Sequence, residues 1–177
     1  MNTTQSAQAG TNEPLAPPVH VLFVCLGNIC RSPMAEAVFR HKVAEVGLSE
    51  QVLVDSAGTG NWHAGEPPHR GTRQILEKRG ISHTGMVARQ IRSSDLDHYD
   101  YILTMDRMNF QDVERLGSAR GILRPFLAYA PHTGVEEVPD PYYTGGFEGV
   151  YQLIEAASDG LLDEIRSRLA ASESLPG

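Results

Sequence analysis

Apolar residues fall into four short runs along the chain, separated by segments with helical signals. The run HVLFVC, residues 20–25, is almost wholly apolar, which is typical of a strand buried on both faces of a sheet. Residues 51–59 (QVLVDSAGT) and 99–106 (YDYILTMD) predict two further strands. Residues 121–129 (GILRPFLAY) predict a fourth strand, which Pro125 weakens because proline has no amide hydrogen to donate.

Helices are predicted between and after these strands. The first begins with Ser32 as N-cap and Pro33 at the first helical position, and it ends at Gly47. Residues 72–80 and 107–117 predict two shorter helices, each followed or stopped by glycine. The last predicted helix carries apolar residues at helical spacing, namely Val150, Leu153, Ile154, Ala157, Leu161, Ile165 and Leu169.

This alternation of strands and helices predicts a doubly wound α/β fold, with a mostly parallel sheet and helices on both faces. In such sheets, ligands bind beyond the carboxyl ends of the strands. Cys25, Ser56 and Asp106 stand at or near those ends in the first three strands. We expect one domain over residues 19–173, with a disordered tail at residues 1–18 and a short tail at residues 174–177.

Charge and composition restrict the partners and the compartment. The net charge of −7 and pI of about 5.4 argue against nucleic acid or an anionic membrane as the main partner. An anionic ligand must therefore be attracted by a local site. Two cysteines are too few for a disulfide framework, which indicates a reducing cytoplasm. The sequence shows no run long enough to span a membrane, and its first residues lack the pattern of a signal peptide.

The loop CLGNICRSP, residues 25–33, combines features that suit an anion. A short loop between a strand end and a helix N-terminus can curl until its backbone N–H groups converge, and the helix dipole adds to their attraction. Gly27 and Asn28 tolerate the left-handed backbone that such a curl needs. Arg31 offers a planar fork of donors for two phosphate oxygens. Cys25 would lie at the floor as a thiolate stabilised by Ser32, placed for attack on phosphorus.

Other interpretations of this loop are weaker. A cysteine at a strand end is most often a small core residue, but here it coincides with the curl, the arginine and the helix start. A metal site is disfavoured because there is no CxxC pair and no second ligand cluster. A Walker loop is excluded because the sequence contains no GxxxxGK.

CLGNICRSP closely resembles the signature CxGNxCRSP of the low-molecular-weight protein tyrosine phosphatases. The resemblance extends from about residue 20 to 170. It includes the following motifs in the family's order and spacing: DSAGT (55–59), Trp62, ARQ (88–90), YILTMD (101–106) and DPYY (140–143). It implies a four-stranded parallel sheet and hydrolysis through a phosphocysteine intermediate, without metal or cofactor.

The resemblance also implies roles for individual residues. Cys25 would be the nucleophile, Arg31 would hold the phosphoryl group, and Asp140 would be the general acid. Without the resemblance, an aspartate in VPDPYYTGG would be interpreted as a turn residue. The remaining assignments are the phosphate-binding amides of Leu26, Gly27, Asn28, Ile29, Cys30 and Arg31, loop support by Asn28, Ser32 and Ser56, and substrate-binding aromatic walls from Trp62, Tyr142 and Tyr143.

Two positions stay open at this level. Cys30 resembles a cysteine that forms a reversible disulfide with the nucleophile, but it could also be a small loop residue. Many relatives carry a histidine where this chain has Met86, and the nearby His83 is displaced along the chain, so we assign it no role. We interpret five other histidines as surface or loop residues, namely His41, His63, His69, His98 and His132. Asp106 could support the loop or begin a helix.

Three alternative functions fit the sequence less well. Arsenate reductases of this fold need further cysteines downstream, and none follows Cys30. Protein-arginine phosphatases carry threonine where Ile29 stands, so Ile29 and the tyrosine pair favour an aryl phosphate. A phosphotyrosine-binding module or thiol sensor without turnover would be favoured only if Arg31 or Asp140 were missing. We therefore expect phosphotyrosine-containing proteins and phosphate or other oxyanions as partners, and a monomer with at most weak self-association.

Overall fold

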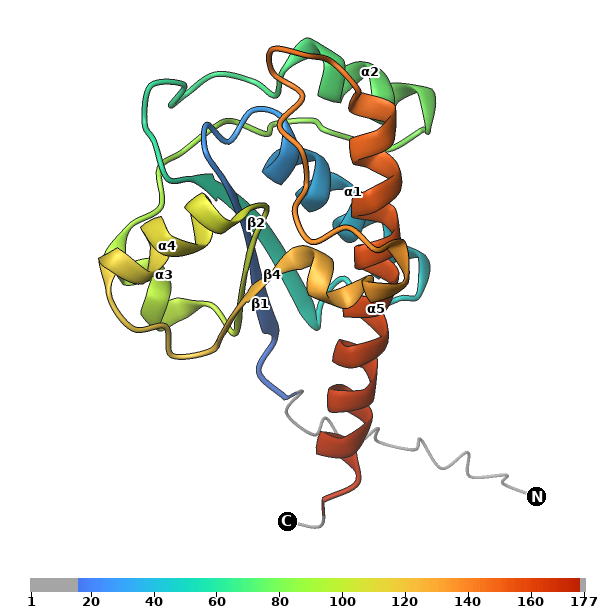
Figure 1. The fold of residues 1–177 in the computed structure, drawn as a ribbon. Coiled ribbons are helices and arrows are strands. Elements are labelled where there is room, and N and C mark those ends of the chain that lie inside the picture. Colours follow the sequence, from blue (N-terminus) through green and yellow to red (C-terminus); the bar gives the residue numbers. More distant parts are fainter. Residues whose placement is uncertain (1–15, 176–177) are drawn as a thin grey trace, which may run out of the picture.

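The computed structural model describes residues 16–175, and these residues form a single parallel sheet flanked by helices (Figure 1). The four strands are β1 (Val19–Cys25), β2 (Val52–Gly58), β3 (Tyr101–Thr104) and β4 (Ile122–Pro125), in the spatial order β2-β1-β3-β4. The helices are α1 (Arg31–Glu45), α2 (Arg70–Lys78), α3 (Ser93–His98), α4 (Arg107–Leu116) and α5 (Phe147–Glu173). Two short 3₁₀ helices, η1 (Phe126–Tyr129) and η2 (Pro131–Thr133), follow β4.

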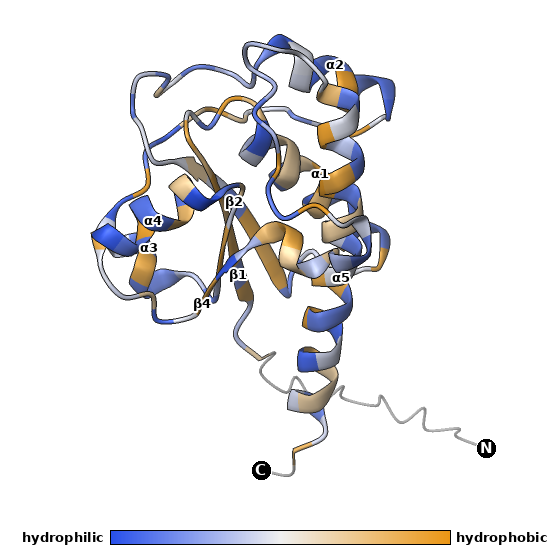
Figure 2. Ribbon diagram, in the orientation of Figure 1, coloured by the Kyte–Doolittle hydropathy of each residue, from blue (hydrophilic) through white to orange (hydrophobic). Residues whose placement is uncertain are grey.

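The central strand β1 is buried on both faces, as its apolar sequence predicts. Its odd-numbered residues Val21, Phe23 and Cys25 join the larger core, which also includes side chains of α1 and α5. Leu22 and Val24 point to the smaller core formed with α3 and α4. Figure 1 shows α1 and α5 on one side of the sheet and α3 and α4 on the other, and Figure 2 shows the strands between them as largely hydrophobic. The predicted doubly wound α/β fold is confirmed.

The structure corrects three local predictions. Ser32 is not the N-cap of the first helix, because α1 begins at Arg31 with Cys30 at the N-cap position. Its hydroxyl is instead bound to side chains of the loop. The fourth strand ends at Pro125 and continues as η1, because proline cannot donate the next ladder hydrogen bond. Helix α3 was not predicted, since its six residues are too few to show a helical period.

The predicted tail at residues 1–18 lies mostly outside the described residues, as does the end of the predicted tail at residues 174–177. Within residues 16–175, no helix is both long and apolar enough to cross a membrane.

Candidate active site

A pocket of about 250 Å³ opens at the carboxyl end of β1, where the chain turns into α1. Its floor is the loop from Cys25 to Arg31, and two further segments, which are distant in sequence, form its walls. The residues that line it are Cys25, Leu26, Gly27, Ile29, Cys30, Arg31, Trp62, His63, Asp140, Tyr142 and Tyr143. The structure therefore brings together most of the residues that the sequence assigned to one site. Asn28, Ser32 and Ser56 do not line the pocket, and hydrogen bonds join their side chains to one another instead.

The loop turns its carbonyl groups outward. The carbonyl oxygens of Cys25, Leu26 and Ile29 accept hydrogen bonds of 2.7–2.9 Å from the amides of Thr59, Gly60 and His69. Within residues 16–175, none of the five amides from Leu26 to Cys30 donates a hydrogen bond to a protein acceptor. Five unpaired donors at a helix N-terminus form a concave site for an anion.

Asn28 fixes the shape of this curl. It is the only residue other than glycine with a left-handed backbone among the described residues, with φ of 55°, and it is buried. Its Nδ2 donates to Ser32 Oγ at 2.8 Å and to Ser56 Oγ at 2.9 Å, and its Oδ1 accepts from the amide of Arg89 at 3.0 Å. Three hydrogen bonds thus hold a conformation that asparagine tolerates better than most residues.

The thiol of Cys25 is bound from behind by Ser32, with 2.9 Å between Sγ and Oγ. Because Ser32 Oγ already accepts from Asn28, its own hydrogen is available to the sulfur. The other acceptor near Ser32 is the carbonyl of Ala57, at a longer 3.4 Å. A hydroxyl that donates to Cys25 stabilises the thiolate form of that side chain.

Arg31 is buried at the edge of the pocket, and its guanidinium is joined to two carboxylates. Its Nη1 donates to Asp106 Oδ2 at 2.7 Å and to the carbonyl of Val138 at 2.9 Å. Its Nη2 lies 3.6 Å from Asp140 Oδ2. Burial lowers the pKa of Arg31, but Cys25 and the carboxylates Asp106 and Asp140 outweigh it and hold that pKa above its ordinary value. The guanidinium is therefore a permanent cation beside the pocket.

Asp106 has both of the roles that the sequence left open. Its Oδ2 accepts from Arg31, while its Oδ1 accepts from the amide of Asn109 and so caps α4. This carboxylate anchors Arg31 to the end of β3. Its position directly after an apolar strand was the signal in the sequence.

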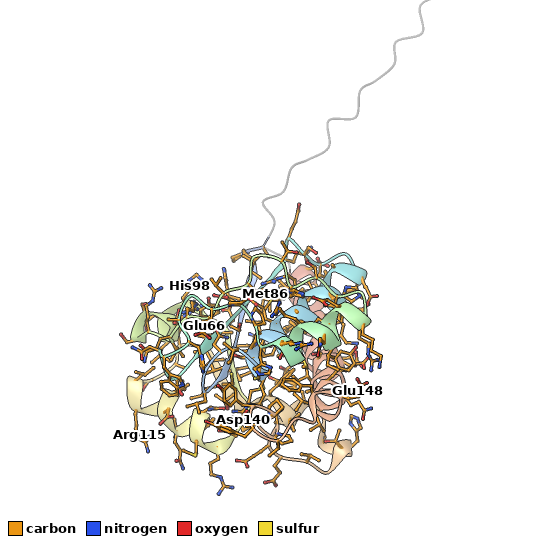
Figure 3. The ribbon with its side chains drawn as sticks, turned by 90° about the horizontal axis from the view of Figure 1, so that it is seen from above. Glu66, Met86, His98, Arg115, Asp140 and Glu148 are labelled. Carbon is orange, nitrogen blue, oxygen red and sulfur yellow. The ribbon has the colours of Figure 1, made fainter. Side chains whose placement is uncertain are left out.

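Asp140 lies on the loop before α5, between Arg115 on one side of the molecule and Glu148 on the other (Figure 3). Its side chain is 41% exposed and its Oδ1 accepts from the amide of Tyr142 at 3.1 Å. The same carboxylate therefore shapes the turn and lines the pocket. The turn interpretation and the site interpretation both fit its geometry.

The aromatic wall is built around Tyr142. Its ring packs edge-on against Tyr143, with centroids 4.6 Å apart, and lies 5.9 Å from His63 and 5.7 Å from His69. Tyr143 is 90% exposed and Trp62 is 62% exposed, so neither is a core residue. Their flat faces are available to a ligand.

Two histidines belong to this wall, although the sequence placed them among surface and loop residues. His63 lines the pocket, and its Nδ1 lies 2.8 Å from Glu66 Oε2. His69 caps α2 through its Nδ1 and stacks on Phe147 at 5.1 Å. The Gly- and Pro-rich loop that follows β2 was the only signal for either.

The segment that precedes Arg89 carries the departure from the family pattern. Met86 packs against the larger core, and His83 is occupied by Glu77 at 3.0 Å on the surface. His83 therefore does not replace the usual histidine. In this part of the chain, Arg89 supports the phosphate loop, because its backbone amide donates a hydrogen bond to Asn28.

Cys30 lies in the loop with its thiol buried, and both cysteines are free. Burial, Cys25 and Asp140 raise the pKa of Cys30 to about 12, against an opposing effect of Arg31. Cys30 is therefore a neutral thiol at ordinary pH. Among residues 16–175, no three His, Cys, Asp or Glu side chains gather to hold a metal ion.

Comparisons with known proteins agree with this geometry. Residues 20–171 match the family model for low molecular weight phosphotyrosine protein phosphatases. The low molecular weight protein-tyrosine-phosphatase YfkJ of Bacillus subtilis is 49% identical over 150 residues, covering 84% of this chain and 96% of that protein. PtpA of Staphylococcus epidermidis, which carries the same description, is 45% identical over 148 residues, covering 83% of this chain and 94% of that protein.

Solved structures give the same result. The crystal structure of YfkJ superimposes with a TM-score of 0.84 at 47% identity, covering 86% of this chain and 98% of that one. A Drosophila arginine phosphatase superimposes with a TM-score of 0.77 at 33% identity, covering 82% of this chain and 96% of that one. The chain therefore belongs to the low-molecular-weight protein tyrosine phosphatase family and is a phosphatase.

Proposed function

We propose that this phosphatase hydrolyses phosphotyrosine in proteins without a metal ion, through a phosphocysteine intermediate. One observation carries the proposal: Cys25, the unpaired amides of the loop, Arg31 and Asp140 all border the same pocket. A nucleophile, an oxyanion site and a proton donor are the three parts that phosphoryl transfer requires.

In the first step, the Cys25 thiolate attacks the phosphorus atom in line with the departing phenolate. The amides from Leu26 to Arg31 and the Arg31 guanidinium hold the three remaining oxygens, where negative charge develops in the transition state. Ser32 stabilises the sulfur before the attack and again when it departs. Arg31 is prepared for this role by Asp106, which fixes one edge of the guanidinium.

Asp140 supplies the proton that the phenolate needs as it departs. In the second step the same carboxylate accepts a proton from water, which attacks the phosphocysteine and releases phosphate. Asp140 leaves the first step as a carboxylate, and the second step leaves it protonated for the next turnover. General acid catalysis contributes about 10²–10⁴-fold to such reactions.

The substrate ring would lie between Trp62 and the tyrosine pair. Stacked or edge-on aromatic contacts contribute about 0.5–1.5 kcal/mol each beyond the burial of area. The structural similarity to an arginine phosphatase makes phosphoarginine the second candidate substrate. Ile29 lines the pocket and favours the apolar aryl group over a guanidinium.

We propose that Cys30 protects Cys25 from irreversible oxidation. Peroxide converts the Cys25 thiolate to a sulfenic acid, and the Cys30 sulfur displaces hydroxide from it, giving a disulfide and water. Both thiols border the pocket. Burial and Cys25 raise the pKa of Cys30 to about 12 in the reduced enzyme, so Cys30 does not compete there as a nucleophile. The Cys30→Ser variant should lose activity to peroxide without recovery by dithiothreitol, whereas wild type recovers.

Hydrolysis of p-nitrophenyl phosphate in the presence of EDTA tests the mechanism. Wild type should turn over, Cys25→Ser should be inactive, and Asp140→Asn should be slowed by about 10²–10⁴-fold on phosphotyrosine peptides. If wild type binds phosphate without turnover, the enzyme is only a binding module. A normal pH profile of Asp140→Asn would remove Asp140 from its role.

The substrate class needs a separate experiment. A panel of phosphotyrosine, phosphoserine and phosphoarginine peptides should be hydrolysed with phosphotyrosine preferred, and a preference for phosphoarginine would replace the substrate assignment. Cys25→Ser retains the cradle and should trap phosphoproteins from a lysate. We place these substrates in the cytoplasm because the chain has only two cysteines, both free. Cell fractionation tests this assignment.

A further inference from the structure

The segment around Arg89 lies against the free edge of β2, beside the phosphate loop. The amide of Gly58 donates to the carbonyl of Arg89, and the amide of Ile91 donates back to the carbonyl of Gly58, both at 2.8 Å. The amide of Arg89, directly before these two bonds along the chain, donates to Asn28 Oδ1 at 3.0 Å. The Arg89 amide therefore supplies one of the three hydrogen bonds that hold the Asn28 side chain, which fixes the curl of the loop.

The side chain of Arg89 binds the segment to two other elements. Its Nε and Nη2 donate to Asp55 Oδ2 on β2 at 3.2 and 3.0 Å. Its Nη1 donates to Asp95 Oδ2 on α3 at 2.9 Å, and Nη2 reaches Asp95 Oδ1 at 3.4 Å and the Tyr99 hydroxyl at 3.3 Å. One guanidinium thus joins three segments of the chain.

The charges and protonation states in this cluster fit one another. Burial lowers the pKa of Arg89, but Asp95 and Asp55 raise it further above its ordinary value. Burial and Asp55 raise the pKa of Tyr99 to about 12, so its hydroxyl keeps its proton and donates to Asp55 Oδ2 at 3.1 Å. The Tyr99 hydroxyl therefore accepts a hydrogen bond from Arg89 and donates one to Asp55.

The segment needs such an anchor because it has little regular structure of its own. Residues 79–92 connect α2 to α3 without a helix, and they include Gly80 and Gly85 with left-handed backbones. Connecting segments of this kind are mobile unless they are tied to the rest of the domain. The hydrogen bond to Asn28 Oδ1, the one of its three that this segment supplies, can therefore be only as well placed as the segment itself.

We propose that Arg89 is a positioning residue for phosphate binding, acting through its backbone amide on Asn28 while Asp55, Asp95 and Tyr99 hold its guanidinium. The inference rests on the proposed binding of the phosphoryl group by the loop. It assigns to Arg89, which lies outside the pocket, control over how well the unpaired amides converge on that group. No chemical step passes through Arg89.

The test compares Arg89→Lys with Arg168→Lys as a matched control. Lysine keeps the charge but cannot bridge two carboxylates. Arg168 is an arginine of α5 whose Nη1 donates to the Tyr101 hydroxyl at 2.6 Å, and none of its hydrogen bonds involves the phosphate loop. For each variant, the inhibition constant of inorganic phosphate, kcat and KM for p-nitrophenyl phosphate, and stability in urea are measured.

Arg89→Lys should raise the inhibition constant of phosphate by about tenfold, an effect of the size of one lost hydrogen bond, and should lower kcat. Arg168→Lys should lose stability, while its inhibition constant for phosphate and its kcat stay unchanged. If Arg89→Lys leaves phosphate binding and kcat within twofold of wild type, the proposal is wrong. If Arg89→Lys does not fold, Tyr99→Phe removes one hydroxyl from the cluster and should raise the same constant by two- to threefold.

A double-mutant cycle shows whether the effect passes through Asn28. Asn28→Gly keeps the left-handed backbone and the loop amide but removes the side chain. In that background, Arg89→Lys should cause no further change in phosphate binding, and a full tenfold change would contradict the proposed route. These outcomes differ from a failure of the proposed function, because in that case wild type itself would neither bind phosphate competitively nor turn over.

Discussion

Replacing Gly58 by alanine tests how rigidly the phosphate loop is supported. Gly58 ends β2 and pairs in register with Cys25. A methyl group on it would lie 2.7 Å from the carbonyl oxygen of Leu26, 3.0 Å from the amide nitrogen of Asn28 and 3.1 Å from the carbonyl carbon of Gly27. All three are backbone atoms of the loop, so no side chain can rotate to make room.

The magnitude follows from these contacts. Ordinary contact begins near 3.4 Å, so the loop backbone must move by about 0.7 Å at Leu26. Forcing an extra methyl into a packed site typically costs about 1–3 kcal/mol of stability. A displacement approaching 1 Å of groups that position a substrate can lower the rate by about 10²-fold. We therefore expect Gly58→Ala to fold, to lose about 2 kcal/mol, and to lose at least about tenfold in kcat/KM.

Two other glycines serve as controls for the same chemical change. Gly149 lies in α5 with no atom within 4 Å of an added methyl, so Gly149→Ala should gain about 0.5–1 kcal/mol and keep its kinetics. Gly160 would place its methyl 2.1 Å from the carbonyl oxygen of Tyr129, remote from the loop. Gly160→Ala should therefore lose stability and keep its kcat/KM.

The assays are urea unfolding followed by far-ultraviolet circular dichroism and steady-state hydrolysis of p-nitrophenyl phosphate with phosphate as inhibitor. If Gly58→Ala binds phosphate and turns over as wild type does, the loop is compliant and its rigid support is not needed. If Gly160→Ala loses as much kcat/KM as Gly58→Ala, the loss reflects stability alone. Either result would refute the reasoning from the contacts.

Three further predictions follow from buried groups. Burial, opposed by Arg40 and aided by Asp55, raises the pKa of Glu36 from 4.5 to about 7, so the protein loses up to about 3 kcal/mol as the pH rises from below 4.5 through 7. Glu36→Gln should remove this loss, which is measured by urea unfolding at pH 5 and pH 8, and equal pH dependence of the two proteins would contradict it. In Cys25→Ser, the remaining Cys30 should react with iodoacetamide at pH 8 at least about tenfold more slowly than free cysteine, because burial, the largest cause of its raised pKa, is retained in this variant. Mass spectrometry follows the reaction, and alkylation at the rate of free cysteine would refute the assignment. Ser32→Ala should lower kcat by about tenfold or more, since a hydrogen bond to a charged group contributes about 1.5–3 kcal/mol. Stopped-flow kinetics measure kcat, and an unchanged value would show that Ser32 does not stabilise the Cys25 thiolate.

The phosphate loop could be predicted from the sequence because its parts are adjacent. Within ten residues, the chain passes from the end of a buried strand through a glycine, an asparagine and an arginine to the start of a helix. These close neighbours determine a local geometry. Ser32 shows the limit of this reasoning. Its position suited an N-cap, but Cys25 and Asn28 take its hydroxyl, and no local rule weighs a side-chain partner in a curled loop against a helix amide.

The walls of the pocket could not be predicted from local patterns, because they meet only in the folded chain. Arg31 reaches the carbonyl of Val138 across 107 residues, and Asn28 binds the amide of Arg89 across 61. Resemblance to a family placed Asp140 in the site, while the residues alone favoured a turn. The same reason explains why Arg89 was recognised only as part of the ARQ motif, without a role, and why His63 was interpreted as a surface or loop residue.

The central claim is that Cys25 carries the phosphoryl group during turnover. The test is rapid quenching of Asp140→Asn during its reaction, in EDTA, with p-nitrophenyl phosphate that is labelled in the phosphate group. Loss of the carboxylate slows hydrolysis of the intermediate more than its formation, because p-nitrophenolate is a good leaving group. We expect the label on Cys25, located by peptide mass spectrometry, and no labelled protein when Cys25 is also replaced by serine. Turnover by Cys25→Ser at the wild-type rate, with no labelled protein in any variant, would contradict it.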